Sequence, residues 1–190
     1  MARPLSIDED ELLSRLASVF RDLGYEGASL AALSEGAGLQ KASLYHRFPG
    51  GKQQMADEVL AAAIGWFGEN VLAPLKQGGE PKTRIAAAAR RLDDFYSGGR
   101  KACLLNMLSS PRSADGPFSP AIRSSFEALI DAFSRVAREA GHAPKAARRR
   151  AERAVMLMQG SLVLSRGLGS GEPFRAFLSA LPDDLLGEAA

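Results

Sequence analysis

The chain has 190 residues, of which 46% are hydrophobic and 24% are charged, and its formal net charge is +2. This composition is ordinary for a globular protein, and it excludes a disordered chain and a polycation that binds nucleic acid through its overall charge. A single cysteine, Cys103, rules out an intrachain disulfide, and the longest apolar run, residues 59–67, is too short to span a bilayer. We therefore expect a cytoplasmic protein that does not enter a membrane.

Apolar residues recur at helical spacing along the whole chain, and no stretch alternates as a strand does. Three helices are expected in the N-terminal part of the chain. A capping box at residues 6–9 opens the first helix, and Gly24 ends it. Ser29 is the expected N-cap of the second helix, and the third covers about residues 40–48 and stops at Pro49.

Six further helices are expected in the rest of the chain. The fourth begins near Gly51 or Lys52, ends before Pro74, and connects the first three helices to the remainder. The other five are expected at about residues 82–97, 101–108, 120–141, 144–166 and 173–181. The predicted fold class is therefore all-α with about nine helices.

Residues 29–48 carry the strongest functional signal. Two short helices meet at a tight turn at Gly38, and the second exposes polar side chains while Leu44 and Phe48 face the core. Two helices joined by a short, glycine-containing turn form a helix-turn-helix, which fits the major groove of DNA. The window 39–52 has three basic residues, one histidine and no acid. The pattern therefore predicts contact with double-stranded DNA through this window, and an ordinary polar helix surface is the alternative.

Two kinds of DNA contact are expected. Lysine pairs well with guanine and glutamine with adenine, so the candidates for reading bases are Gln40, Lys41, Ala42 and Ser43. Contacts to phosphates position a helix without reading sequence. The candidates for this second role are Ser29, Tyr45, His46, Arg47 and Lys52.

A single head with three to five phosphate contacts would bind weakly, so useful affinity requires a dimer. Two heads give a salt slope of about −5 to −9, at roughly −0.9 per neutralised phosphate. Residues 154–164 are apolar on every face of the expected helix, so one face can pack internally while another meets a partner. Gly160 and Gly167 would permit close approach of helices. A helix that is fully buried in a monomer is the alternative.

Residues 37–52, which end in the run Phe-Pro-Gly-Gly-Lys, resemble the signature of the tetracycline-repressor (TetR) family of transcriptional regulators. The resemblance is specific over about residues 10–60. Many members place one residue between the Phe-Pro pair and the lysine, whereas here two glycines intervene, which is similar to one branch of the family. The resemblance implies that Tyr45 and Lys52 contact phosphates.

The resemblance also implies two domains, a helix-turn-helix DNA-binding domain at residues 1–52 and a helical ligand-binding and dimerisation domain at residues 53–190. It implies a dimer interface made by the last two helices of each subunit, with candidates Leu157, Gly160, Ser161, Leu164, Gly167, Phe174, Phe177 and Leu178. A pocket for a small-molecule effector is implied as well, with candidates Trp66, Phe67, Phe95, Tyr96, Met107, Phe126, Phe133 and Met158. For each of these eight side chains, plain core packing is the competing interpretation.

We therefore expect a ligand-responsive transcriptional repressor that binds a near-palindromic operator as a homodimer. Two alternatives remain, a helical small-molecule-binding protein whose head no longer binds DNA and an activator that uses the same head. The chain has only two histidines, and it lacks both a cluster of residues at metal-ligand spacing and a glycine-rich phosphate loop. Neither a cofactor, a metal nor an enzymatic activity is expected.

Overall fold

The computed structural model describes residues 7–109 and 115–187. These residues form ten α-helices and one π-helical segment, with no strand among them, so the all-α prediction is confirmed. Three of these elements, α4 (Gly51–Phe67), η1 (Gly68–Leu72) and α5 (Ala73–Lys76), follow one another without a break. Counting them as one continuous helix gives the nine helices predicted from the sequence.

The described residues divide into two compact units. The first contains the described parts of Met1–Ile64 and Leu104–Phe118. The second contains Gly65–Cys103 and the described part of Ser119–Ala190. The chain therefore passes from the first unit to the second inside α4. Residues 53–64 belong to the first unit, although the sequence analysis assigned them to a second domain.

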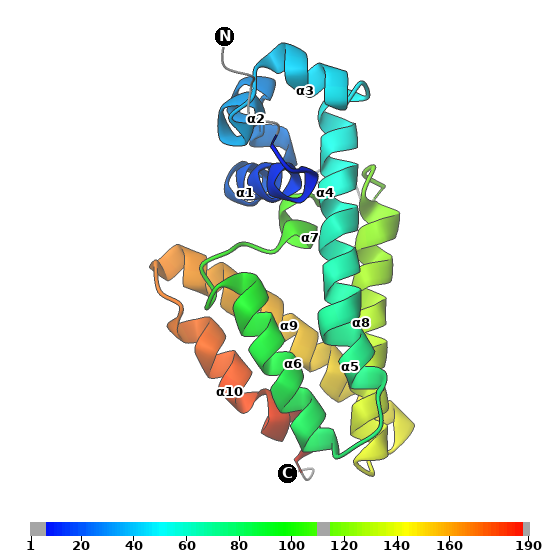
Figure 1. The fold of residues 1–190 in the computed structure, drawn as a ribbon. Coiled ribbons are helices and arrows are strands. Elements are labelled where there is room, and N and C mark those ends of the chain that lie inside the picture. Colours follow the sequence, from blue (N-terminus) through cyan, green and yellow to red (C-terminus); the bar gives the residue numbers. More distant parts are fainter. Residues whose placement is uncertain (1–6, 110–114, 188–190) are drawn as a thin grey trace. The chain divides into compact units, whose positions relative to one another are not determined.

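The first unit is built around the three N-terminal helices. It contains α1 (Glu9–Gly27), α2 (Leu30–Ala37), α3 (Lys41–Arg47), the first part of α4, and α7 (Leu104–Met107). Helix α1 packs against α2 and α7, and α2 packs against α3 (Figure 1). The buried side chains at the centre of this unit are Leu12, Leu16, Phe20, Leu33, Leu44, Phe48 and Met55.

Helix α1 begins at Glu9 and has Asp8 as its N-cap residue, without a side-chain capping hydrogen bond. The predicted capping box placed the start of this helix at Ser6, which lies outside the described residues. Its other member, Glu9, does not occupy the third helical position, and its carboxylate instead forms an ion pair of 2.6 Å with Arg47. The capping-box prediction is therefore wrong for Glu9. The helix is interrupted at Gly24, where it was predicted to end and where φ is 70° and ψ is 174°, and helical residues then continue to Gly27.

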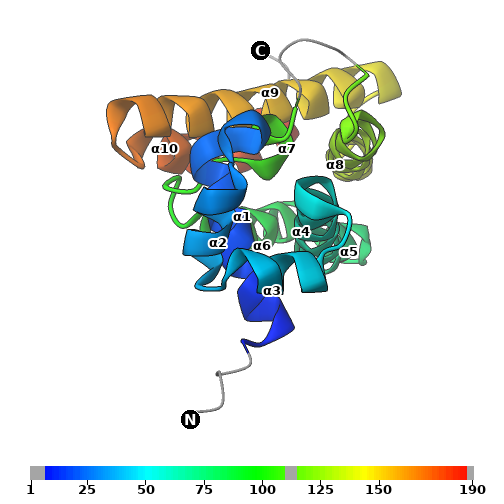
Figure 2. The same ribbon diagram turned by 90° about the horizontal axis from the view of Figure 1, so that it is seen from above.

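The second unit is built mainly from longer helices. It contains η1, α5, α6 (Pro81–Tyr96), α8 (Ser119–Glu139), α9 (Pro144–Leu168) and α10 (Glu172–Leu186), together with the last residues of α4. Helix α9 packs along α8 and α10, and α10 also packs against α6. Figures 1 and 2 both show α10 lying beside α9. The fully buried side chains in this unit include Leu75, Ile85, Leu92, Phe133, Phe174 and Leu185.

The fourth predicted helix runs past the proline that was expected to end it. Helical residues continue through η1 to Lys76, with Pro74 in the first turn of α5. Proline is tolerated in the first turn of a helix, where its missing N–H has no helical partner to lose. The backbone hydrogen bonds of η1 follow the π-helical pattern, so a new α-helix, α5, begins after it. Pro74 therefore lies in the first turn of α5, although helical residues precede it.

The last helix also extends beyond its predicted end at residue 181, because α10 continues through Pro182 to Leu186. Leu185 is fully buried and anchors the final turn. The backbone carbonyl of Asp184 accepts a hydrogen bond of 2.7 Å from Arg150, which satisfies one of the free carbonyls at the helix end. Tertiary contacts therefore outweigh the proline.

Two other helices differ in length from the prediction. The helix expected at residues 101–108 is reduced to the single turn α7, and α9 continues past residue 166 to Leu168. No helix in the described part of the chain is both long enough and apolar enough to cross a membrane.

Candidate nucleic-acid interface

Helices α2 and α3 form the predicted helix-turn-helix. The Ser29 side chain accepts a hydrogen bond of 3.1 Å from the backbone N–H of Ala32, which confirms it as the N-cap of α2. Gly38 adopts a left-handed conformation, with φ of 68° and ψ of 26°, that few other residues tolerate. Residues 38–40 then connect the end of α2 to the start of α3.

Helix α1 holds this pair of helices in place. One nitrogen of the Arg15 guanidinium donates a hydrogen bond of 3.2 Å to the carbonyl of Ala37, in the last turn of α2. A Cβ added at Gly36 would lie only 2.3 Å from Cγ2 of Val19, so the backbone of α2 approaches the α1 side chains closely. Helix α1 therefore fixes the position of α2 in the helix-turn-helix.

Helix α3 buries one face and exposes the other. Leu44 is 1% exposed and Phe48 is fully buried, as the sequence predicts. Tyr45 is 46% exposed and lies on the outer surface. The other exposed candidate contacts are Ser29, Gln40, Lys41, Ala42, Ser43 and His46. A continuous polar surface of α3 is thus available to a partner.

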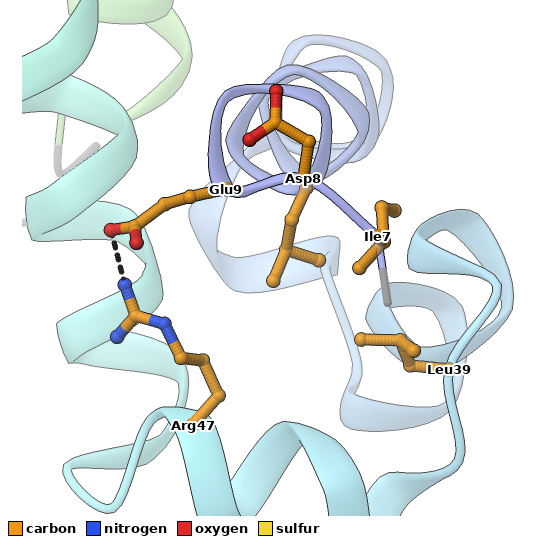
Figure 3. A pocket seen from close by; sticks show the side chains of 6 residues that line it. Ile7, Asp8, Glu9, Leu39 and Arg47 are labelled. Atoms are coloured by element: carbon orange, nitrogen blue, oxygen red, sulfur yellow. Dashed lines mark hydrogen bonds and ion pairs between the residues drawn. The ribbon is translucent and has the colours of Figure 1, made fainter. Parts of the chain in front are cut away.

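Arg47 is placed differently from its neighbours, because its guanidinium is bound by two carboxylates of the same unit. It lies 2.6 Å from Glu9 in α1 and 3.1 Å from Glu58 in α4. The Glu9–Arg47 pair crosses a cleft of about 580 Å³, on whose other side Ile7 and Leu39 face each other (Figure 3). Arg47 therefore ties the end of α3 to both α1 and α4.

Lys52 also has a partner within the first unit. Its ammonium donates a hydrogen bond of 2.8 Å to the backbone carbonyl of Tyr25 and lies 4.5 Å from the centre of the Tyr25 ring. Gly51, just before it, has a φ of 66°, a conformation that favours glycine. The amide of Gly50 donates to the Gln54 side chain at 2.8 Å, which fixes the start of α4.

Glu58 and Tyr25 hold Arg47 and Lys52, and neither is among the site residues predicted from the sequence. Glu58 is eleven positions from Arg47, and Tyr25 is twenty-seven positions from Lys52. Neither separation corresponds to neighbours on one helix face, so no local pattern marks these pairs. They come together only in the folded unit.

The candidates for an effector pocket are divided between the two units. Trp66, Phe67 and Phe95 form a half-buried aromatic group in the second unit, with ring centres 4.8 Å apart for Trp66 and Phe95 and 5.8 Å apart for Phe67 and Phe95. Four other candidates, all in the second unit, are half-buried or buried: Tyr96, Phe126, Phe133 and Met158. Met107 lies in the first unit, where it lines a cavity of about 350 Å³.

The candidates for a dimer interface fall into two groups. Ser161, Phe174 and Phe177 are 8%, 0% and 7% exposed, so their side chains belong to the core of the chain itself. Leu178 is half-buried. The exposed candidates lie along one face of α9, beside further exposed apolar side chains that the sequence analysis did not include. Together these residues form the α9 stripe, which consists of Met156, Leu157, Gly160, Val163, Leu164, Gly167 and Leu168.

Comparison with protein families gives two matches that together cover most of the chain. A model described as bacterial regulatory proteins of the tetR family matches residues 12–59. A second model, described as the C-terminal domain of LmrA/YxaF-like transcriptional regulators, matches residues 82–179. The second match alone spans more than half of the chain.

Two curated proteins are similar to this chain over different lengths. The HTH-type transcriptional regulator LmrA of Bacillus subtilis is 24% identical over 179 residues, which cover 92% of this chain and 94% of the relative. The HTH-type transcriptional repressor KstR2 of Mycolicibacterium smegmatis is 39% identical over 58 residues, which cover 30% of this chain and 28% of the relative.

Solved structures share the fold over nearly the whole chain. A TetR transcriptional regulator from Legionella pneumophila superposes with a TM-score of 0.79 at 18% identity, covering 94% of this chain and 97% of the other. A cysteine mutant of the TetR family regulator CifR, complexed with 26-bp double-strand operator DNA, gives a TM-score of 0.72 at 25% identity and covers 95% and 98%.

Proposed function

Because this chain belongs to the TetR family of bacterial transcriptional regulators, we propose that it is a ligand-responsive repressor that binds a near-palindromic operator as a homodimer. The observation that carries the proposal is the exposed polar face of α3. That face projects from a helix whose opposite side is anchored by Leu44 and Phe48. A supported helix of this kind fits the major groove.

We assign base reading to the N-terminal part of α3. Lys41 supplies donors for guanine and Gln40 supplies a donor and an acceptor for adenine. Ala42 and Ser43 contribute short apolar and polar contacts. All four residues are exposed, so binding DNA requires no rearrangement of the core.

We assign phosphate contacts to Ser29, Tyr45, His46 and Lys52, which lie around the base-reading residues. Ser29 stands at the N-terminus of α2, where backbone N–H groups also favour an anion. Arg47 is left out of this group because Glu9 and Glu58 already neutralise its charge. Its proposed role is to hold α3 at a fixed angle to α1 and α4.

We place the dimer interface on the α9 stripe. Leu164 is 57% exposed and Leu168 is 70% exposed, and contiguous exposed apolar surface of this kind marks a protein–protein contact. The two glycines of the stripe have no atom within 4 Å of an added Cβ, so a partner helix has room to approach the backbone. Phe174 and Phe177 support the interface from within the chain.

We place the effector among the helices of the second unit, next to the aromatic group of Trp66, Phe67 and Phe95. These three side chains are only half-buried and offer flat apolar surface to a small molecule. Release of DNA then requires only a few kcal/mol of differential affinity between the two conformations of the dimer. The proposed location is the cytoplasm, where the DNA is.

A selection from random DNA duplexes tests this function. The purified protein is expected to enrich a near-palindromic sequence, which then shifts in a gel with the wild-type chain. Replacing Lys41 by Ala should change the enriched bases, whereas Tyr45→Phe should weaken all sequences alike. The negative control is Arg91→Gln, which removes the charge of an exposed arginine of the second unit and should leave the selected sequence unchanged. A wild-type chain that enriches no sequence would refute DNA recognition.

A further inference from the structure

The end of helix α1 offers an unused carbonyl to Lys52. In a continued α-helix, the carbonyl of Tyr25 would accept a hydrogen bond from the amide of Ser29. Helix α1 ends at Gly27, with Ala28 in a non-helical conformation, and the Ser29 amide donates to the Gly27 carbonyl instead, at 2.9 Å. The Lys52 ammonium replaces the Ser29 amide as the donor and forms a hydrogen bond of 2.8 Å with the Tyr25 carbonyl.

The same ammonium lies over the Tyr25 ring, 4.5 Å from its centre. A carbonyl and an aromatic face together restrict a side chain that is otherwise among the most flexible in proteins. Lysine has three N–H donors, and one is used here, so two remain for an anion. In the described part of the chain, no carboxylate lies within ion-pair distance of Lys52.

Arg47 and Lys52 differ in the charge of the groups that hold them. Both residues are basic, both are half-exposed, and both lie within three positions of Pro49 in the sequence. Arg47 is neutralised by two carboxylates, whereas Lys52 is held by two uncharged groups. The contacts of Lys52 therefore fix its position and leave its charge available.

The Tyr25 ring is itself held by aromatic neighbours. The edge of the Phe118 ring meets it at 74°, with centres 4.9 Å apart, and Phe20 lies at 6.4 Å and 20°. Phe118 is only 2% exposed. Burial, Glu26 and Asp57 raise the pKa of the Tyr25 phenol, so the ring that faces Lys52 stays uncharged at neutral pH.

We propose that Tyr25 and Phe118 are positioning residues for DNA binding, in which Tyr25 presents the Lys52 ammonium to a phosphate and Phe118 holds the Tyr25 ring. The inference rests on the proposed function, since it requires DNA as the partner of Lys52. It also links the two units along the chain. Phe118 is the last residue of the first unit, and Ser119 begins α8 of the second.

The test is the salt dependence of binding to the duplex enriched by the wild-type chain. Lys52→Ala should lower the slope of log K against log salt by about 1.8 per dimer, or roughly 0.9 per head. Tyr25→Leu, which removes the ring and keeps the backbone carbonyl, should lower the slope by a similar amount and reduce affinity about tenfold at 0.15 M salt. Tyr25→Phe retains the ring and should keep the wild-type slope.

A double-variant cycle separates positioning from a structural role. In a chain that carries Lys52→Ala, the further change Tyr25→Leu should cause no additional loss of affinity. Leu75→Ala in the core of the second unit is the control for general destabilisation, and it should keep the slope. Phe118→Leu leaves Lys52 and Tyr25 intact, and it should still lower the slope, so it carries the test if Tyr25→Leu does not fold.

A wild-type slope in both Tyr25→Leu and Phe118→Leu would overturn the inference, as would fully additive losses in the double variant. Either result would reduce the Tyr25–Lys52 contact to a cap on α1, visible only as a lower melting temperature. These outcomes differ from failure of the proposed function, in which the wild-type chain enriches no duplex at all.

Discussion

Replacing Arg47 by Gln tests whether this residue supports α3 or contacts DNA. The change removes two ion pairs, in which the side chains are 37% exposed for Arg47, 64% for Glu9 and 30% for Glu58. Exposed ion pairs contribute about 0.2–1 kcal/mol each. Arg47 and Glu9 are more than one-third exposed, so water weakens both pairs. The expected loss of unfolding free energy is therefore about 0.5–1.5 kcal/mol. With a urea slope of roughly 2.5 kcal/mol per molar, the midpoint should fall by about 0.2–0.6 M.

The assay is urea unfolding at fixed protein concentration, together with the salt slope of DNA binding. Arg91→Gln is the matched control, because Arg91 and Asp94 lie 4.0 Å apart and are 56% and 68% exposed, so its midpoint should hardly move. Arg47→Gln should lower the midpoint and keep the salt slope. A slope lowered by about 1.8 would refute our reasoning, since it would mean that Arg47 leaves its carboxylates and neutralises a phosphate.

Three further predictions concern the second unit. Leu164→Arg places a charge in the α9 stripe and should convert the dimer to a monomer in sedimentation at micromolar concentration; a persistent dimer would exclude this surface. Gly171→Ala should cost about 1–3 kcal/mol in urea unfolding, because the new Cβ would lie 2.2 Å from the carbonyl oxygen of Gly98, whereas Gly65→Ala, with open space around it, should not destabilise the chain. Hydrogen bonds from Thr83, first from its side chain, lower the pKa of Glu80 at the start of α6, so its contribution is present above the ordinary glutamate pKa of about 4.3 and lost as pH falls. The difference in urea midpoint between wild type and Glu80→Gln should therefore shrink from about pH 6 to about pH 3, and a constant difference would contradict this cause.

The helices of this chain were predictable where local signals agree with packing. Ser29 and Gly38 mark the start and the end of α2 because capping and left-handed backbone are properties of a few residues. The predictions fail at Pro74 and Pro182, where proline was taken as a stop. The two errors have different origins, since η1 gives Pro74 a position in the first turn of α5, whereas the buried Leu185 holds the end of α10 beyond Pro182.

The exposed residues of the candidate interface were predictable from the sequence, but the contacts that hold Arg47 and Lys52 were not. Helical periodicity separates Leu44 from Tyr45, because burial of one face follows from the 3.6-residue repeat. Whether an exposed basic side chain has an ion-pair partner depends on carboxylates that are distant in sequence. Glu9 is thirty-eight positions from Arg47, and only the fold of the first unit brings the two together.

This difference changes the charge available to DNA. Residues 39–52 contain three basic residues, Lys41, Arg47 and Lys52, and the structure commits one of them to Glu9 and Glu58. Lys52 at a phosphate and Lys41 among the base edges both place a cation against the DNA and both displace counterions. Two lysines per head therefore give four cations per dimer, and the expected salt slope is about −3.6, shallower than the −5 to −9 expected from the sequence. Raising salt fourfold should then lower affinity by roughly 150-fold. A measured slope of −7 or steeper would show that cations outside this window also reach the phosphates, whereas a slope near −2 would leave one lysine per head in contact and exclude either Lys41 or Lys52.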